Sequence, residues 1–180
     1  MKSFIQFLTY FRIIASPGIF FFIVVSNDFG LALSIFFLAG ISDFWDGYLA
    51  RKYDHESVLG GILDPIADKI LLMFMILALS IHLSSAFIGI IGGLILAREF
   101  WVSALRNFNS QNGYPNLMEV TFLAKMKTAV QFTALFIYLS GLFMNNGLLL
   151  LMAHLMFFGS MIISLKTGME YTIKTFNAFN

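Results

Sequence analysis

Four aspartates are spaced so that their side chains could meet at one place. Asp43 and Asp46 are three residues apart, so both lie on one face of a helix. Asp64 and Asp68, four residues apart, share a face of the following helix. If the two helices form an antiparallel hairpin that turns near His55, Asp46 and Asp64 both lie nine residues from the turn. Asp43 and Asp68 lie twelve and thirteen residues from it, so the four carboxylates should converge from two helices.

Four carboxylates at one place predict a site for metal ions. Like charges in a poorly hydrated setting cannot all stay ionised unless a positive charge compensates them. Two divalent cations would balance the four charges, and a ligand set made only of oxygen suits Mg²⁺ or Mn²⁺. A pair of such ions about 4 Å apart clamps a phosphoryl group during displacement at phosphorus. The pattern therefore indicates phosphoryl-type transfer, although intramembrane aspartates also build proton relays and ion pathways.

Small residues and an arginine accompany the acids. Gly40, Gly47 and Ala50 lie on the helix face of Asp43 and would let another helix or a ligand approach the backbone closely. A transporter would explain the acids, but it would not explain these small residues or Arg51. We therefore favour a metal-dependent transferase, with a divalent-ion or proton-coupled transporter as the alternative from a different class.

The elements that position these residues are membrane helices. Of 180 residues, 59% are hydrophobic and 12% charged, and the mean hydropathy is +0.84, far above that of a soluble domain. A window of about 20 residues, the length that crosses the hydrocarbon core, separates six apolar stretches: 4–26, 30–52, 60–83, 86–106, 121–144 and 147–170. We predict an all-α integral membrane protein, a six-transmembrane-helix bundle that forms a single domain over residues 1–180.

The cations predict which side each helix end faces. Alternate helix ends hold all eleven: Lys2, Arg12, Arg51, Lys52, Lys69, Arg98, Arg106, Lys125, Lys127, Lys166 and Lys174. The opposite ends hold none, which is typical of the positive-inside bias. Both termini and the metal site should therefore face the cytoplasm, in a multi-pass protein of the cell membrane.

The composition also excludes several classes of site and partner. The chain has no Cys, so it has no disulfide, thiolate zinc site or cysteine nucleophile. Its three His residues are scattered, which argues against zinc. A net charge of +1 indicates no nucleic-acid partner. The longest loop is predicted over 107–118, and Pro65 should either open its helix or kink it.

The acidic residues also form a longer pattern, D-x2-D-G-x2-A-R-x8-G-x3-D-x3-D, over residues 43–68. This pattern resembles the signature of the CDP-alcohol phosphatidyltransferases, position for position. The resemblance implies a homodimer of six-helix subunits that transfers a phosphatidyl or related group from a CDP-linked donor to an alcohol, with release of CMP. It implies that the four aspartates bind two Mg²⁺ or Mn²⁺ ions and that Asp68 is also the general base. The implied donor-binding residues are Asp43, Asp46, Gly47, Ala50, Arg51, Gly60 and Asp64.

The acceptor depends on residues outside this pattern. If the acceptor carries a phosphate, cations must bind it, and Arg is suited to bidentate contact with phosphate. The candidates for this pocket are Arg98, Arg106, Lys125 and Lys127, together with Arg12. The same cations could instead be snorkelling anchors at the cytoplasmic surface, with Arg98 paired to Glu99.

A narrower resemblance points to one acceptor. The segments FLTYFRIIASP, LDPIADKI, REFWVSALR and KMKTAVQ are similar to those of bacterial phosphatidylglycerophosphate synthases. The implied donor is CDP-diacylglycerol, the implied acceptor is sn-glycerol 3-phosphate, and the implied location is the bacterial cytoplasmic membrane. Within the same family, the alternatives are a cardiolipin synthase that uses phosphatidylglycerol and an inositol-phosphate transferase. The larger choline and ethanolamine phosphotransferases are argued against by length.

Overall fold

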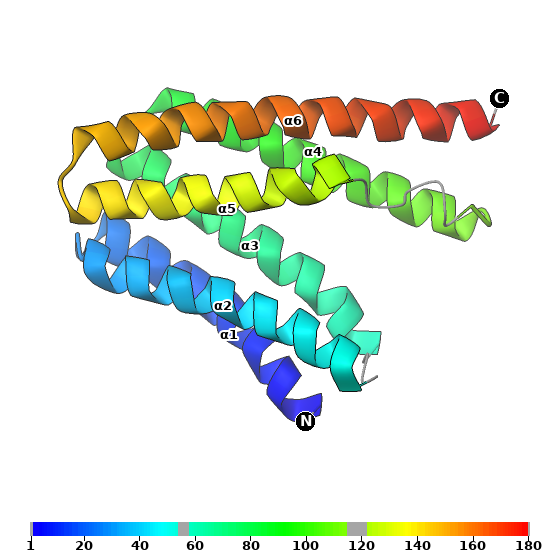
Figure 1. The fold of residues 1–180 in the computed structure, drawn as a ribbon, viewed down its shortest axis with the longest axis horizontal. Helices are drawn as coiled ribbons and strands as arrows, with labels where there is room; N and C mark the ends of the chain where they lie inside the picture. Colours follow the sequence, from blue (N-terminus) through cyan, green and yellow to red (C-terminus); the bar gives the residue numbers. More distant parts are fainter. Residues whose placement is uncertain (1, 54–57, 115–121, 180) are drawn as a thin grey trace.

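The computed structural model describes residues 2–53, 58–114 and 122–179, and it describes their side chains except at 2–6, 43, 44, 46–53, 58–62, 124 and 125. All the regular elements in these ranges are helices (Figure 1). They are α1 (Lys2–Val24), α2 (Phe29–Tyr53), α3 (Val58–His82), α4 (Ala86–Gln111), α5 (Phe122–Phe143) and α6 (Gly147–Phe179).

The apolar segments of these helices are of membrane-spanning length. Among the described residues, α1, α3, α4, α5 and α6 each contain an apolar segment long enough to cross a bilayer. The apolar part of α2 found in this way, Phe29–Ser42, is shorter. The prediction of an all-helical membrane protein with six helices is confirmed. A membrane crossing by α2 and the side that the termini face stay predictions.

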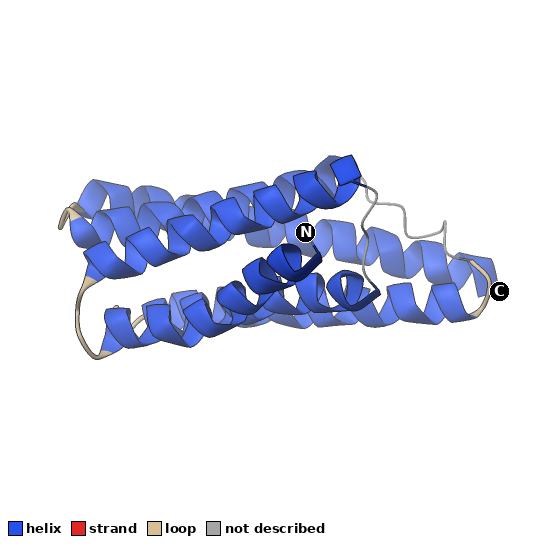
Figure 2. Cartoon of the chain, turned by 90° about the horizontal axis from the view of Figure 1, so that it is seen from below, coloured by secondary structure: helices blue, strands red, loops and turns tan. Residues whose placement is uncertain are grey.

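Three tight turns join the helices at one end of the bundle (Figure 2). Each contains one residue with a positive φ: 53° at Asn27, 46° at Ser84 and 48° at Asn145. Asp28 accepts a hydrogen bond from the backbone N–H of Leu31 at 3.0 Å, which satisfies a free donor at the start of α2. The two chain termini lie at the other end (Figure 1). The cation-free turns and the two termini are thus at opposite ends, as the charge pattern predicts.

The order of packing places α1 at the centre of one half of the bundle. Helix α1 packs against both α2 and α3, and α6 packs against both α4 and α5. Contacts of α2 with α5 and of α3 with α4 join the two halves. Phe36 of α2 stacks on Phe132 of α5 with 5.9 Å between ring centroids. A Cβ on Gly92 would overlap Ile76, so this glycine lets α3 and α4 approach closely.

Helix α4 is longer than its apolar stretch. The prediction of a loop over 107–118 is wrong for residues 107–111, because α4 continues to Gln111. In this extension Asn109 is buried and donates from Nδ2 to Thr175 Oγ1 of α6 at 2.8 Å. Tertiary contact with α6, which itself runs to Phe179, stabilises the helix beyond the apolar segment.

Pro65 lies inside α3, which begins seven residues earlier at Val58. Of the two predicted alternatives, that Pro65 opens its helix or kinks it, the first is therefore wrong. Because proline has no N–H, the carbonyl one turn earlier lacks its usual helical partner. Pro65 is exposed and lines the polar cavity described below, next to Asp68.

Candidate active site

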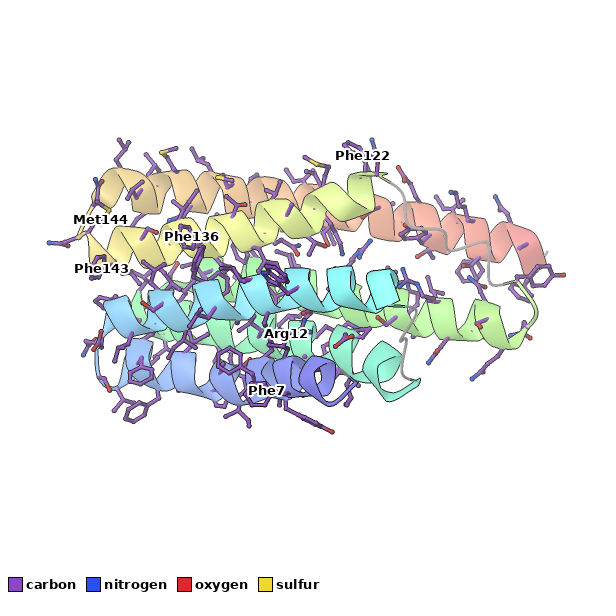
Figure 3. The ribbon with its side chains drawn as sticks, turned by 60° about the horizontal axis from the view of Figure 1, so that its bottom comes forward. Phe7, Arg12, Phe122, Phe136, Phe143 and Met144 are labelled. Carbon is purple, nitrogen blue, oxygen red and sulfur yellow. The ribbon has the colours of Figure 1, made fainter. Side chains whose placement is uncertain are left out.

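Arg12 of α1 binds both described aspartates of the predicted metal site. Its Nη1 donates to Asp68 Oδ1 at 2.6 Å and its Nη2 donates to Asp64 Oδ1 at 3.2 Å. Thr9, three residues earlier on α1, donates from Oγ1 to the same oxygen of Asp64 at 2.6 Å. The Arg12 side chain is fully buried and lies among the helices in Figure 3, whereas Phe122 projects outward. Helix α1 therefore holds the two carboxylates of α3 together.

This arrangement fits a site for hard divalent cations. The side chains of Asp64 and Asp68 keep 34% and 39% of their exposure, so solutes can reach them. The atoms of these two side chains that could ligate a metal ion are carboxylate oxygens, which suit Mg²⁺ or Mn²⁺. Arg12 contributes one positive charge against the two carboxylates, so it does not by itself balance their charge. Among the described residues, no group of three or more His, Cys, Asp or Glu side chains forms a complete metal site.

The other half of the predicted metal site lies on α2. This helix includes positions 43 and 46, and it packs against α1 as α3 does. The side chains of several predicted site residues lie outside the described part of the structure: Asp43, Asp46, Gly47, Ala50, Arg51, Gly60 and Lys125. The convergence of four carboxylates and the donor-binding roles on α2 thus stay predictions.

A polar cavity connects Asp68 to the cations of α4 and α5. It consists of two adjoining spaces of about 170 and 200 Å³. Both spaces are lined by Glu99, Ser103, Arg106 and Thr128. The first also contacts Asp68, Lys69 and Gln131, and the second contacts Arg98, Lys127 and Tyr171. The predicted base and three of the five predicted phosphate-binding cations therefore line two adjoining spaces that share four lining residues.

The predicted phosphate-binding residues differ in how their donors are used. Arg98 is buried and donates from Nε to Ser164 O and from Nη2 to Thr167 Oγ1, both at 2.8 Å. Its Nη1 donates to Glu99 at 3.0 Å, which confirms the expected ion pair. Arg98 therefore joins α4 to α6, and most of its donors are already used. Arg12 contacts the aspartates of α3 instead and does not line either polar space.

Two other predicted cations, Arg106 and Lys127, also line the cavity. Arg106 is exposed and forms no ion pair with the residues that the structure describes. Lys127 is buried and paired with Glu99, the same acid that binds Arg98. Because one carboxylate is shared by two cations, the cavity around Glu99 and Arg106 keeps a positive charge. This charge suits a phosphate dianion.

Sequence reasoning missed Lys69 and Ser103. Lys69 Nζ donates to Ser103 Oγ at 2.5 Å and lies 5.8 Å from the centroid of the Phe100 ring. Both residues line the space that Asp68 lines. The sequence contains a signal for Lys69, because it follows Asp68 directly, but the charge pattern uses this lysine only to predict topology. It adds a cation beside the predicted base.

Gly168 of α6 provides a prediction about the position of Arg98. A Cβ at Gly168 would lie 2.9 Å from Arg98 Cγ and 3.1 Å from Nε. Gly168→Ala should displace this tethered side chain and lower the free energy of unfolding by about 1–3 kcal/mol. Thermal unfolding in detergent would measure the loss. Gly159→Ala on the same helix is the control, because a Cβ there meets open space; an equal loss in both variants would contradict the prediction.

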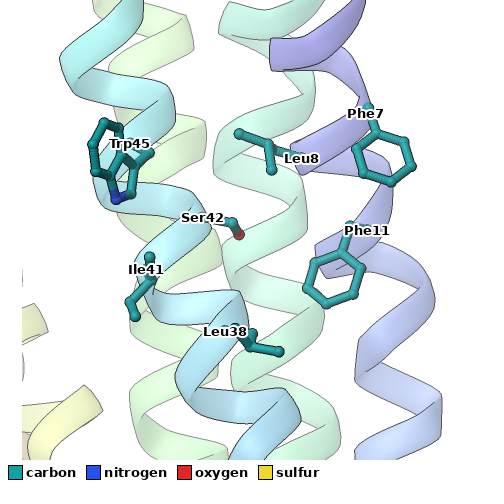
Figure 4. A pocket seen from close by; sticks show the side chains of 7 residues that line it. All are labelled: Phe7, Leu8, Phe11, Leu38, Ile41, Ser42 and Trp45. Atoms are coloured by element: carbon teal, nitrogen blue, oxygen red, sulfur yellow. The ribbon is translucent and has the colours of Figure 1, made fainter.

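Two apolar cavities flank α2 beside Trp45, which lies between the predicted metal ligands Asp43 and Asp46 in the sequence. One, of about 590 Å³, opens between α1 and α2 and is lined by Phe11, Leu38 and Trp45 among others (Figure 4). The other, of about 440 Å³, lies between α2 and α5 and also reaches Trp45. Gly40 lines this second cavity, and a Cβ there would meet no atom within 4 Å. Among the described residues, no neighbouring helix therefore packs closely against position 40.

Comparison with known proteins adds an independent finding. Residues 5–164 match the family model of the CDP-alcohol phosphatidyltransferases. A CDP-diacylglycerol–glycerol-3-phosphate 3-phosphatidyltransferase of Wigglesworthia glossinidia brevipalpis is 32% identical over 91% of this chain and 90% of its own length. Proteins of the same name from Haemophilus influenzae and Escherichia coli K12 are 35% and 34% identical, over 72% and 71% of this chain and 71% of each relative.

Proposed function

Because the chain belongs to the CDP-alcohol phosphatidyltransferase family, we propose that it transfers the phosphatidyl group of CDP-diacylglycerol to sn-glycerol 3-phosphate. The products are phosphatidylglycerophosphate and CMP. The observation that carries the proposal is the polar cavity, which is lined by Asp68 and by several cations. A phosphorylated alcohol needs both: a base for its hydroxyl and positive charge for its phosphate. The names of the relatives, which specify the same donor and acceptor, support this assignment.

The metal ions of this proposal are two Mg²⁺ or Mn²⁺ ions held by Asp43, Asp46, Asp64 and Asp68. When bound, they neutralise the pyrophosphate of the donor and the charge of the departing CMP. Arg12 and Thr9 hold Asp64, and Arg12 also holds Asp68, so these carboxylates are placed before any ion arrives.

The acceptor binds in the polar cavity with its phosphate toward Arg106, Lys127 and Lys69. Its primary hydroxyl then attacks the β-phosphorus of the donor. A new oxygen–phosphorus bond forms, the bond from that phosphorus to the CMP oxygen breaks, and the hydroxyl proton passes to the Asp68 carboxylate. Arg98 lines the cavity and acts as a positioning residue, because it is paired with Glu99 and joins α4 to α6.

The donor lipid lies at the cytoplasmic membrane surface. The apolar cavities on both sides of Trp45 suit its acyl chains, because they open beside the part of α2 that carries the donor-binding positions. The proposed location is the bacterial cytoplasmic membrane with the site facing the cytoplasm, which the cation-free turns at the other end support. The homodimer that the resemblance implies stays a prediction.

The decisive experiment offers purified protein CDP-diacylglycerol, Mg²⁺ or Mn²⁺ and one acceptor at a time. Glycerol 3-phosphate, inositol phosphate, serine and phosphatidylglycerol are compared by CMP release and by the lipid product. We expect phosphatidylglycerophosphate from glycerol 3-phosphate. Product from phosphatidylglycerol instead would identify a cardiolipin synthase. If no acceptor yields CMP, while liposomes containing the protein show metal or proton flux, the chain is a transporter and the proposal is wrong.

Arg106→Ala tests the acceptor pocket. The variant should raise KM for glycerol 3-phosphate roughly 10- to 100-fold, because a charge-assisted hydrogen bond is worth about 1.5–3 kcal/mol. KM for CDP-diacylglycerol should change little. Lys174→Ala is the control, since it removes an exposed cation of α6 that does not line the cavity. Equal changes in both Michaelis constants would show that Arg106 does not bind the acceptor specifically.

A further inference from the structure

Gln131 of α5 is a buried polar side chain that the proposed mechanism does not use. It is only 3% exposed, and its Nε2 has no hydrogen-bond partner among the described residues. Its neighbours on the same helix differ, since Lys127 is paired with Glu99 and Thr133 donates to the carbonyl of Ala129. Leaving a buried amide donor unpaired costs about 1–3 kcal/mol, so such a group calls for an explanation.

The position of Gln131 indicates what its partner is. It lines the same polar space as Asp68, whereas Lys127 and Arg98 line the adjoining one. Gln131 follows Lys127 by four residues, which places it one helical turn, about 6 Å, farther along α5. The space of Asp68 and Gln131 is also lined by Lys69 and Arg106, so the proposed base, the neutral amide and two cations that would face the phosphate share one space. A neutral amide is suited to a hydroxyl group.

We propose that Gln131 is a specificity-determining residue that hydrogen-bonds the secondary hydroxyl of the acceptor while Asp68 receives the proton of the primary hydroxyl. This inference rests on the proposed function and extends it from a phosphorylated alcohol to a vicinal diol phosphate. A hydroxyl group both donates and accepts, so it satisfies the amide in either orientation of the Gln131 side chain. An acceptor that lacks this hydroxyl leaves the buried amide unpaired and should be discriminated against.

The test compares glycerol 3-phosphate with 1,3-propanediol monophosphate, which lacks only the secondary hydroxyl. The wild-type protein should favour glycerol 3-phosphate by about tenfold in kcat/KM, the worth of one hydrogen bond. In Gln131→Leu, glycerol 3-phosphate should lose that factor while the deoxy acceptor keeps its rate. The preference should therefore fall to about one.

Three outcomes would overturn the inference in different ways. Retention of the wild-type preference in Gln131→Leu shows that the residue does not read the secondary hydroxyl. An equal fall for both acceptors shows that Gln131 contacts the phosphate instead. Absence of turnover with either acceptor in the wild type defeats the proposed function, and the inference with it. If Gln131→Leu does not fold, Gln131→Met carries the same test with an unbranched apolar side chain of similar length.

Discussion

Asp68→Asn should abolish phosphatidyl transfer while the protein stays folded. The amide has nearly the shape of the carboxylate, but it cannot take a proton from the attacking hydroxyl and supplies no negative charge to a metal ion. We expect kcat to fall by a factor of about 10³ or more, since general base catalysis alone contributes roughly 10²–10⁴. CMP release with glycerol 3-phosphate measures the change. The Arg12 contact to Asp68 at 2.6 Å predicts some loss of stability as well.

Folding and donor binding separate this effect from damage to the bundle. The variant should elute as the wild type does in detergent and should still bind CDP-diacylglycerol. Asp28→Asn is the matched control, because Asp28 accepts from the backbone of Leu31 at the opposite end of the bundle. Its turnover should match that of the wild type. Residual turnover of Asp68→Asn above about a tenth of wild type would show that Asp68 is not an essential base.

Two aspartates of the predicted metal site could be placed side by side from the sequence because the relevant geometry is local. Helical periodicity places Asp64 and Asp68 on one face whatever the rest of the fold, and the structure finds both bound to one guanidinium. The partner itself could not be found in this way. Arg12 lies 52 residues before Asp64, and no pattern in the chain specifies that α1 packs against α3. We therefore assigned its cation to the acceptor phosphate, whereas the structure finds it bound to the aspartates.

The cations of α4 and α5 show a second limit. The positive-inside bias explains every Lys and Arg at this end equally well, so the sequence could not separate the joining role of Arg98 from the exposed position of Arg106. Only contacts between helices that are distant in the sequence distinguish the two roles, because Arg98 binds Ser164 and Thr167 of α6. The same reason explains why the end of α4 was misplaced, since Asn109 looks like a loop residue until Thr175 is beside it.

Arg12→Met should destabilise the protein strongly when divalent cations are absent and much less when they are present. In the variant, Asp64 and Asp68 lose the cation that faces them both, at 3.2 and 2.6 Å. Removing one partner of a buried ion pair costs about 3–5 kcal/mol, and the partial exposure of both carboxylates places the expected loss near the lower figure. At roughly 2–4 °C per kcal/mol for a chain of this size, the Tm in EDTA should fall by about 10 °C.

Saturating Mg²⁺ or Mn²⁺ should restore much of this loss, because an ion that binds only the folded protein stabilises it and supplies the missing positive charge. Lys166→Met, which removes an exposed cation of α6, should lower Tm little in either condition. A fall in the Tm of Arg12→Met that is the same with and without Mg²⁺ would mean that Arg12 stabilises the helix packing alone. The two carboxylates would then not belong to a metal site. Selective recovery would instead show that Arg12 and the divalent cations serve the same two aspartates, which would link the described half of the site to its proposed chemistry.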